Sequence, residues 1–526
     1  MKKLGTSWLV PLAETAIIRR LADAAMVRHA HYRVRELDRM DAAKVQEHTL
    51  LKLVRHASRT RFGIDHGFDS LSTVTEYQAR VPLRDYEFFW EHYWKDRYPA
   101  IDNQTWPGPI PYFALSSGTT SGTTKYVPVS HEMVKANRKA AFTSTALFRH
   151  VFPQSHLLTG KFFFLGGSTD MRPLPNGSFA GDLSGVAAKE VADVVRPYTF
   201  PPLDLGTIGD WEVKLPRLAE ASIREPITAV SGVPSWMLKL FDTVLQLSGK
   251  RTLADVWPEL RLIVHGGTLF DPYREAFRKT IGNDAVQTID VYPSSEGFIA
   301  SEDPRYHLLR VLPDLDLFFE FIPVEELGQE RPTRHTLRTA EVGVNYAIAL
   351  TSCAGVWSNL IGDTVRFESL APPLLRFTGR TKYFLSAFGE HLIQEEVDRA
   401  VALAAQRTGV MTVDHHVGPV YPTEPNRPGF HQYFVEFRGS PPADLEVFRT
   451  ILDGELSRLN EDYAAHRVGN LTMLMPAIRV VPEGGFAEWM ASRGKAGGQN
   501  KVPRMDNTGA ITKQLGEWLN QRDMKR

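Results

Sequence analysis

ITAVSGVPSWMLKLFDTVLQL (227–247) runs from a short apolar strand into an amphipathic helix. Two further apolar runs follow it, LRLIVHGG (260–267) and VQTIDVYPSSEG (286–297), and KFFFLGG (161–167) precedes it. Each of these runs ends in glycines or in a polar turn, as buried strands do. Strands that alternate with helices are typical of a parallel sheet covered by helices, so this stretch predicts an α/β fold.

Working outward from this stretch, the chain divides into regions of different pattern. Its 526 residues exceed one ordinary hydrophobic core, so we expect more than one domain. HQYFVEF (431–437) predicts a strand near the C-terminus, and apolar residues at steps of three and four between 444 and 467 predict one helix there. We therefore expect a large multi-layer α/β domain at 1–382 and a small α+β domain at 383–526.

Composition excludes several classes of protein. Lys+Arg and Asp+Glu both number 61, and this balance argues against a dedicated nucleic-acid binder. One cysteine, Cys353, permits no internal disulfide and no cysteine-based zinc cluster, and it fits a cytoplasmic protein. The sequence has no run of 18 apolar residues, so no membrane span is predicted. We interpret the N-terminal MKKLGTSWLVPLAETAIIRR (1–20) as the first helix of the fold, with a signal peptide as the alternative.

The segment SSGTTSGTTK (116–125) has the composition of a phosphate-binding loop. Glycines let the backbone turn so that several N–H groups face one anion, while hydroxyls add donors and a lysine adds positive charge. Its spacing differs from that of the P-loop NTPases, which place a lysine directly after the second glycine. The candidate phosphate contacts are Ser116, Ser117, Gly118, Thr119, Thr120 and Lys125.

Weaker candidates follow predicted strands, where ligand groups are common in open α/β sheets. In the turn Tyr292-Pro293-Ser294-Ser295-Glu296-Gly297, the tyrosine could stack on a base and Glu296 could hold Mg²⁺, although an ordinary serine-rich turn would look the same. Asp363, after Gly362, could accept both ribose hydroxyls or could be an ordinary turn aspartate. Gly267 would allow a nucleotide to approach the backbone, and Lys501 lies in a glycine-rich stretch near the C-terminus.

The order of these motifs resembles that of the adenylate-forming superfamily of acyl-CoA synthetases, peptide-synthetase adenylation domains and luciferases. Within it, the chain resembles the Gretchen Hagen family of acyl-acid-amido synthetases. The resemblance spans about 110 to 504 and is carried by FALSSGTTSGTTKYVPVS (113–130), ELRLIVHGGTLFDPYREAF (259–277), VYPSSEGFIA (291–300), GVWSNLIGDTVRF (355–367), FTGRTKYFLSAFGEHL (377–392) and QNKVPR (499–504).

The resemblance implies a mechanism and a set of roles. A small-molecule carboxylic acid would attack the α-phosphate of Mg-ATP, and an amine, expected to be that of an amino acid, would then take the acyl group. ATP and Mg²⁺ are the implied cofactors. Lys501, Lys125 and Glu296 would be the catalytic residues, and Lys382 would lie at the hinge of a mobile C-terminal domain. The implied nucleotide contacts are Ser116, Ser117, Gly118, Thr119, Thr120, Gly267, Tyr292, Ser294, Ser295 and Asp363.

Three questions stay open at this level. An acyl-CoA synthetase and a non-catalytic nucleotide-binding homologue are the alternative functions. Ser358 and Asn359 stand before Gly362-Asp363, where the family often has an arginine and an aromatic residue, and this departure affects the expected local ATP or acyl contacts. The residues of the acyl pocket are scattered and apolar, so the sequence offers only candidates, namely Phe113, Phe164, Trp236 and Met237.

Overall fold

The structure is a computed structural model. It describes residues 10–116, 125–166, 170–208, 210–267, 270, 273–381, 384–422, 427–493 and 502–523. No helix among these residues is long and apolar enough to cross a membrane.

Most of the residues between Val10 and Trp94 are helical. Side-chain caps start several of these helices; Thr73 and Glu76, for example, form a reciprocal capping box that satisfies backbone N–H groups at both positions. The elements are α1 (Val10–Ala13), α2 (Ala16–Arg39), α3 (Ala42–Ala57), α4 (Arg61–Asp65), η2 (Phe68–Ser70), α5 (Val74–Arg80), α6 (Tyr86–Phe89) and η3 (Trp90–Trp94).

A long mixed sheet forms the centre of the molecule and confirms the predicted α/β class. Its strand order is β12-β13-β14-β15-β11-β10-β9-β8-β7-β3-β6. The bounds are β3 (Lys161–Leu165), β6 (Thr199–Phe200), β7 (Ile227–Gly232), β8 (Leu262–Gly266), β9 (Gln287–Ser294), β10 (Gly297–Asp303), β11 (Leu308–Val311), β12 (Leu317–Pro323), β13 (Asn345–Ser352), β14 (Asn359–Leu370) and β15 (Pro373–Arg380).

The direction of strand pairing changes at β9. Strands β6, β3, β7, β8 and β9 pair in parallel, whereas β9 pairs antiparallel with β10 and every later neighbour is antiparallel. Parallel strands need crossover connections, and helices supply them here. The helices of this half are α7 (His131–Val151), η4 (Pro153–Ser155), η5 (Leu157–Thr159), α8 (Leu183–Glu190), η6 (Asp193–Tyr198), α9 (Leu203–Gly206), α10 (Trp211–Ser222), α11 (Pro234–Ser248), α12 (Leu253–Val256) and α13 (Arg274–Ile281), with η8 (Val324–Glu326) after β12.

A smaller sheet lies beside the central one, in the order β2-β1-β5-β4. Its strands are β1 (Tyr112–Ser116), β2 (Lys125–Val129), β4 (Arg172–Pro173) and β5 (Phe179–Gly181). Strands β1 and β2 pair antiparallel, with Ser116 opposite Lys125. The predicted phosphate-binding segment therefore connects the two strands of a hairpin.

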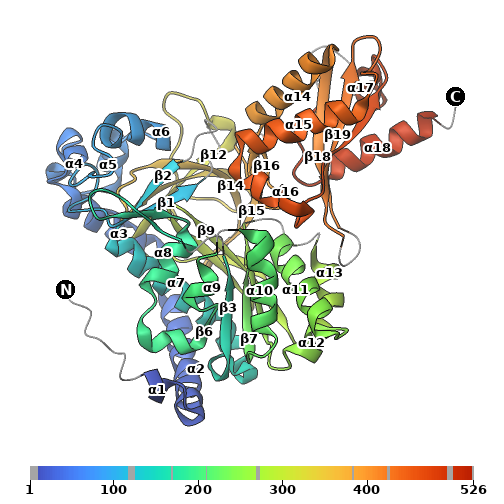
Figure 1. Ribbon diagram of the computed structural model, residues 1–526. Helices are drawn as coiled ribbons and strands as arrows, with labels where there is room; N and C mark the ends of the chain where they lie inside the picture. The colour runs from blue at the N-terminus through green and yellow to red at the C-terminus, as the bar shows by residue number, and fades with distance from the viewer. Residues whose placement is uncertain are drawn as a thin grey trace.

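The C-terminal elements gather at one end of the molecule, coloured orange to red in Figure 1. Sheet β18-β19-β20 is covered by helices, as an α+β unit requires. The elements are β16 (Phe384–Leu385), β17 (Leu392–Ile393), α14 (Gln394–Thr408), β18 (Thr412–Val420), β19 (Phe430–Phe437), α15 (Leu445–Leu459), α16 (Glu461–Arg467), η9 (Val468–Asn470), β20 (Ala477–Val481), α17 (Gly485–Ser492) and α18 (Ala510–Asp523).

One predicted helix is wrong. The apolar periodicity between 444 and 467 continues through a break at Asn460, where α15 ends and α16 begins. Asn460 has an extended backbone, and its side-chain oxygen accepts a hydrogen bond of 2.8 Å from the N–H of Tyr463. An asparagine N-cap of this kind starts a new helix without disturbing the apolar spacing, so periodicity did not reveal it.

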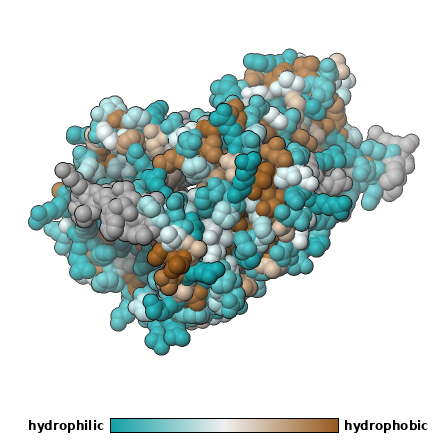
Figure 2. Space-filling model, turned by 60° about the horizontal axis from the view of Figure 1, so that its bottom comes forward, coloured by the Kyte–Doolittle hydropathy of each residue, from teal (hydrophilic) through white to brown (hydrophobic). Residues whose placement is uncertain are grey.

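Buried side chains form two large cores on either side of the β9 junction. One packs the N-terminal helices against β10–β15, and the other packs α10–α13 against the C-terminal elements. Cys353 belongs to the first core, and burial raises the pKa of its thiol, in keeping with a small apolar role. Hydrophilic residues cover most of the face shown in Figure 2, with apolar patches between them.

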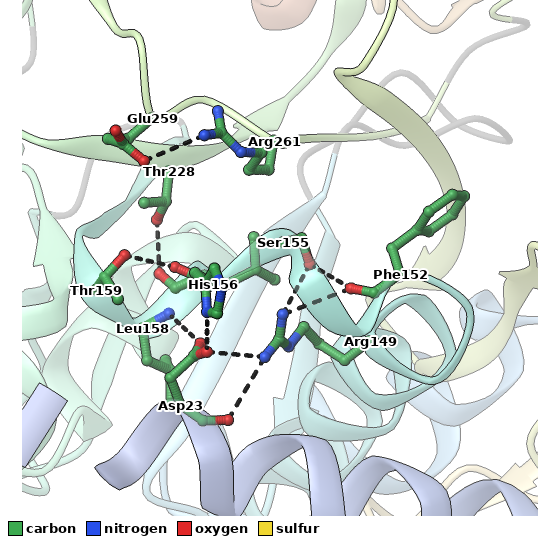
Figure 3. Close-up of polar contacts among 11 residues, drawn as sticks. Asp23, Arg149, Phe152, Ser155, His156, Leu158, Thr159, Thr228, Glu259 and Arg261 are labelled. Atoms are coloured by element: carbon green, nitrogen blue, oxygen red, sulfur yellow. Dashed lines mark hydrogen bonds and ion pairs between the residues drawn. The ribbon is translucent and has the colours of Figure 1, made fainter. Parts of the chain in front are cut away.

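A buried ion pair ties α2 to the end of α7 (Figure 3). The Asp23 carboxylate lies 2.9 Å from the guanidinium of Arg149, which is fully buried. The same carboxylate accepts hydrogen bonds from His156 Nδ1 at 2.9 Å and from the N–H of Leu158 at 3.1 Å. Removal of Asp23 would leave the buried charge of Arg149 uncompensated.

We predict that Asp23→Ala lowers the free energy of unfolding by about 3–5 kcal/mol, since Arg149 would remain buried without its carboxylate. Urea denaturation measures the change. Glu47→Ala is the matched control, because Glu47 pairs with Arg338 at the surface and such pairs contribute under about 1 kcal/mol. Equal losses in the two variants would contradict the assignment of Asp23 as a buried anchor.

Candidate active site

The site is built where the parallel half of the central sheet meets the antiparallel half. Strands β9 and β10 form a hairpin in which Ser294 pairs with Gly297, so Ser295 and Glu296 make the turn. At Gly297 the chain passes so close to β12 that an added Cβ would lie 2.5 Å from Leu317. The predicted YPSSEG motif is therefore a tight hairpin tip at the carboxyl end of a parallel strand, the usual place for ligand groups.

Asp363 lies at the centre of this junction. Tyr292, on β9, donates a hydrogen bond of 2.8 Å from its hydroxyl to Asp363 Oδ2. Arg380 stands opposite Asp363 in the β14–β15 ladder, and its Nε lies 2.7 Å from Asp363 Oδ1. Burial and the neighbouring Asp363 raise the pKa of Tyr292 well above its usual value. Tyr292 and Arg380 therefore hold the carboxylate in one orientation.

The backbone before Asp363 explains why a glycine precedes it. Gly362 has φ +85°, a left-handed conformation that glycine adopts without strain, and a Cβ there would have no contact closer than 3.9 Å. This turn of the chain presents Asp363 toward β9. Asp363 is 5% exposed, which distinguishes it from an ordinary turn aspartate on the surface.

Glu296 is a half-buried carboxylate beside this group. Burial raises the pKa of Glu296, and the nearby Asp363 adds to the rise, whereas Lys125 opposes it. A cation placed next to Glu296 would stabilise the charged form of its carboxylate. Oxygen ligands of this kind suit Mg²⁺.

Lys125 occupies the first position of β2 and is buried rather than open to solvent. Its ammonium lies 2.9 Å from Glu87 of α6 and 4.9 Å from the centre of the Tyr86 ring. The sequence did not indicate Glu87, because nothing in the local pattern links α6 to the glycine-rich segment. Contact between Lys125 and a phosphate would require the ammonium to exchange Glu87 for that anion.

The remaining nucleotide candidates divide into two groups. In the first group, Gly267 has φ +81° and is exposed just after β8. Ser294 donates a hydrogen bond of 3.0 Å to the carbonyl of Gly297, and Ser295 is half-buried in the turn. Ser116 ends β1, although its side chain is not among those described. Ser117, Gly118, Thr119, Thr120, Lys382 and Lys501 lie outside the described residues.

The unusual Ser358 has a structural explanation. Its hydroxyl donates a hydrogen bond of 2.6 Å to Glu320 and accepts one of 2.7 Å from Arg334. Tyr77 lies 3.0 Å from the same hydroxyl. Ser358 is fully buried in this network, so it supports β14 from behind and does not face the group around Asp363.

The polar groups of the site suit a nucleotide better than a metal ion held only by protein side chains. No group of three or more His, Cys, Asp or Glu side chains that could hold a metal lies within the described ranges. An oriented carboxylate, a buried tyrosine and an open glycine backbone instead match a ribose, a base and a phosphate. Glu296 can supply one oxygen to Mg²⁺, which usually keeps water and substrate phosphates as its other ligands.

Comparison with known proteins shows the family to which the chain belongs. Three family models match the chain: the GH3 family N-terminal domain at 33–202, the central domain at 311–380 and the C-terminal domain at 395–510. Jasmonoyl–L-amino acid synthetase JAR4 of Nicotiana attenuata is 24% identical over 553 residues, covering 88% of this chain and 91% of that protein. Indole-3-acetic acid-amido synthetase GH3.3 of Arabidopsis thaliana is 26% identical over 309 residues, covering 55% and 51%.

Solved structures share the fold over nearly the whole length. The AtGH3.15 acyl acid amido synthetase in complex with 2,4-DB superposes with a TM-score of 0.60 at 17% identity, covering 93% of this chain and 96% of that one. A 2-hydroxyisobutyryl-CoA ligase superposes with a TM-score of 0.57 at 14% identity, covering 91% and 92%. The three matched models together span more than half of the sequence, and the chain belongs to the GH3 family.

Proposed function

We propose that this chain is an ATP-dependent acyl-acid-amido synthetase that adenylates a carboxylic acid and transfers the acyl group to an amine, with an amino acid as the acceptor. The observation that carries the proposal is the buried Asp363, held by Tyr292 and Arg380 beside the Glu296 turn. Two GH3 relatives, named as a jasmonoyl–L-amino acid synthetase and an indole-3-acetic acid-amido synthetase, support the choice of an amine acceptor.

The proposed reaction has two balanced steps. In the first, an oxygen of the substrate carboxylate bonds to the α-phosphorus of ATP, and the bond from that phosphorus to the bridging oxygen breaks, releasing pyrophosphate. In the second, the amine nitrogen bonds to the carbonyl carbon of the acyl-AMP. The bond from that carbon to the phosphate oxygen breaks, AMP leaves with the electron pair, and the amine loses a proton.

Each site residue has a part in this scheme. Asp363 accepts hydrogen bonds from the ribose hydroxyls. Tyr292 faces the adenine and also orients the Asp363 carboxylate. Gly267 and the serines of the β9–β10 turn line the path of the nucleotide, and Glu296 would hold Mg²⁺, which supplies charge neutralisation to the phosphates. Lys125 and the segment with Ser116, Ser117, Gly118, Thr119 and Thr120 would contact phosphate oxygens, and Lys501 would stabilise the charge that develops at the α-phosphate.

We also propose the division of the chain at 382/383, with Lys382 at the hinge. The gap between the matched central and C-terminal models, from 380 to 395, supports this position. A small domain that changes orientation could present Lys501 for adenylation and withdraw it for acyl transfer. We place the reaction in the cytoplasm, which the single buried Cys353 fits.

Two other functions remain as outcomes of the test. Similarity to a CoA ligase fold favours thioester formation as the second candidate, because adenylation is common to both and the acceptor differs. A non-catalytic nucleotide-binding protein is the third. Incubation with ATP, the acid and either CoA or a panel of amino acids separates the first two, and the absence of any acyl transfer would leave the third.

We predict acid-dependent exchange between ATP and pyrophosphate, and at least a roughly hundredfold loss of the exchange rate in Lys501→Ala, because a charge that stabilises the transition state is removed. Lys513→Ala, at an exposed position of α18, is the matched control and should keep the rate. The proposal is wrong if folded wild-type protein shows no exchange with any acid of a broad panel.

We predict that Asp363→Asn weakens ATP binding about tenfold or more, since hydrogen bonds from the ribose to a carboxylate are stronger than those to an amide. Calorimetric titration with ATP measures the affinity. Tyr292→Phe should cause a smaller loss, because the ring stays and only the hydrogen bond to Asp363 is lost. Unchanged affinity in Asp363→Asn would remove Asp363 from the nucleotide site.

We predict opposite effects of Glu296→Gln on activity and stability. Because the folded-state pKa of Glu296 is raised above its unfolded value, the folded protein loses stability as pH rises through that pKa and the carboxylate becomes charged. The glutamine variant lacks this loss. Its melting temperature should therefore exceed that of the wild type by more at pH 7.5 than at pH 4.5, while its exchange rate falls at pH 7.5. A pH-independent difference in melting temperature would contradict the raised pKa.

A further inference from the structure

The start of α6 is fixed to the start of β2, the strand that begins with Lys125 (Figure 1). The hydroxyl of Tyr86 accepts a hydrogen bond of 2.8 Å from the N–H of Tyr126 and donates one of 3.4 Å to the carbonyl of the same residue. Asp85 caps the helix, because its side chain accepts a hydrogen bond from a backbone N–H of α6. The backbone that carries Glu87 is therefore held in place beside Lys125.

The residue before this cap connects the same segment to the strand that carries Asp363. The N–H of Arg84 donates a hydrogen bond of 3.1 Å to the carbonyl of Ser358, and the carbonyl of Arg84 accepts one of 2.7 Å from the N–H of Leu360. This parallel bridge lies at the start of β14. Residues 84–87 therefore connect the strand of the candidate ribose carboxylate to the strand of the candidate phosphate lysine.

The charge of Lys125 acts on two carboxylates that come from different elements. Its ammonium lies 2.9 Å from Glu87 Oε1. Burial raises the pKa of Glu296, and the charge of Lys125 opposes that rise, so the lysine is within electrostatic reach of the β9–β10 turn. The side chains of Lys125 and Glu87 are 10% and 31% exposed, and an ion pair partly shielded from water is screened less than a surface pair.

The two members of this ion pair differ in how far they can move. A lysine carries its charge on a flexible four-carbon stem, so the ammonium can turn toward a new partner. Glu87 has a shorter side chain on a backbone that is held from both sides. A phosphate group that approaches Lys125 must draw the ammonium away from Glu87, and the charge left on Glu87 then repels that phosphate. Glu87 therefore opposes the binding of phosphates at Lys125.

We propose that Glu87 is a positioning residue that competes with phosphate groups for Lys125. It holds the ammonium at the start of β2 while the site is empty, yields it when the triphosphate of ATP binds, and takes it back as pyrophosphate leaves. The inference rests on the proposed function and adds to it a residue that promotes release of the first product. Product release, rather than chemistry, limits the rate of many enzymes.

The test is calorimetric titration of the full chain with pyrophosphate, ATP and adenosine in the presence of Mg²⁺. Glu87→Gln removes the competing charge and keeps the size of the side chain, so the affinities for pyrophosphate and ATP should rise about twofold to tenfold. Adenosine carries no phosphate and should bind equally to both proteins, whereas a merely structural role for Glu87 would change all three affinities. Glu91→Gln is the matched control, because Glu91 pairs with Lys95 at the surface just after α6, and it should keep all three affinities.

Lys125→Met provides a second measurement, since it removes the charge and keeps an apolar stem of similar length. It should lower the affinity for pyrophosphate at least about threefold and leave that for adenosine unchanged. Unchanged or weaker binding of pyrophosphate by Glu87→Gln, an equal change for adenosine, or unchanged binding of pyrophosphate by Lys125→Met would overturn this inference and leave the proposed function intact. The titrations need no acid substrate, so absence of exchange with every acid would instead overturn the proposed function.

Discussion

The carboxylate of Asp363 is the feature on which the rest of the site depends. It is taken out of water, and two side chains compensate it from two different strands, Tyr292 by a hydrogen bond and Arg380 by an ion pair. The contact with Tyr292 joins β9 of the parallel half to β14 of the antiparallel half, and the contact with Arg380 joins β14 to its neighbour β15. The two halves of the sheet are therefore linked by a hydrogen bond that also orients the group expected to meet the ribose.

The surroundings of the site follow from this constraint. The hairpin tip with Glu296 can approach Asp363 because Gly297 allows the chain to pass close to Leu317. Strand β14 is supported on its other side by the buried hydroxyl of Ser358 and its partners Glu320 and Arg334. Loss of the close approach at Gly297 or of the Ser358 hydrogen bonds would shift Asp363, although neither residue is expected to contact the nucleotide. The stability of the fold and nucleotide binding are therefore coupled here.

Local sequence was sufficient for much of this account. Apolar runs ending in glycine located the parallel strands, and the order of polar motifs located the edge of the sheet where Tyr292 and Asp363 meet. The sequence alone did not predict the long-range contacts. The pairing of Lys125 with Glu87 joins elements with no shared pattern, and the roles of Arg380 and Ser358 depend on strand register and burial, which a single sequence does not carry.

The segment between β1 and β2 was also predicted only in part from the sequence. Composition predicted a phosphate-binding segment, and the antiparallel pairing of Ser116 with Lys125 shows that it is the connection between two strands. Burial also separates the four apolar candidates for the acyl pocket, which were equivalent in sequence. Phe113, Trp236 and Met237 are buried in the two large cores, whereas Phe164 is 50% exposed.

A crystal structure with a non-hydrolysable acyl-adenylate analogue, an acyl sulfamoyl adenosine, tests the central claim most directly. The account predicts that the ribose hydroxyls lie within hydrogen-bond distance of the Asp363 carboxylate, with Tyr292 and Arg380 still holding it. A nucleotide bound elsewhere, with Asp363 contacting only Tyr292 and Arg380, would show that this buried carboxylate holds the sheet together and does not bind the ligand.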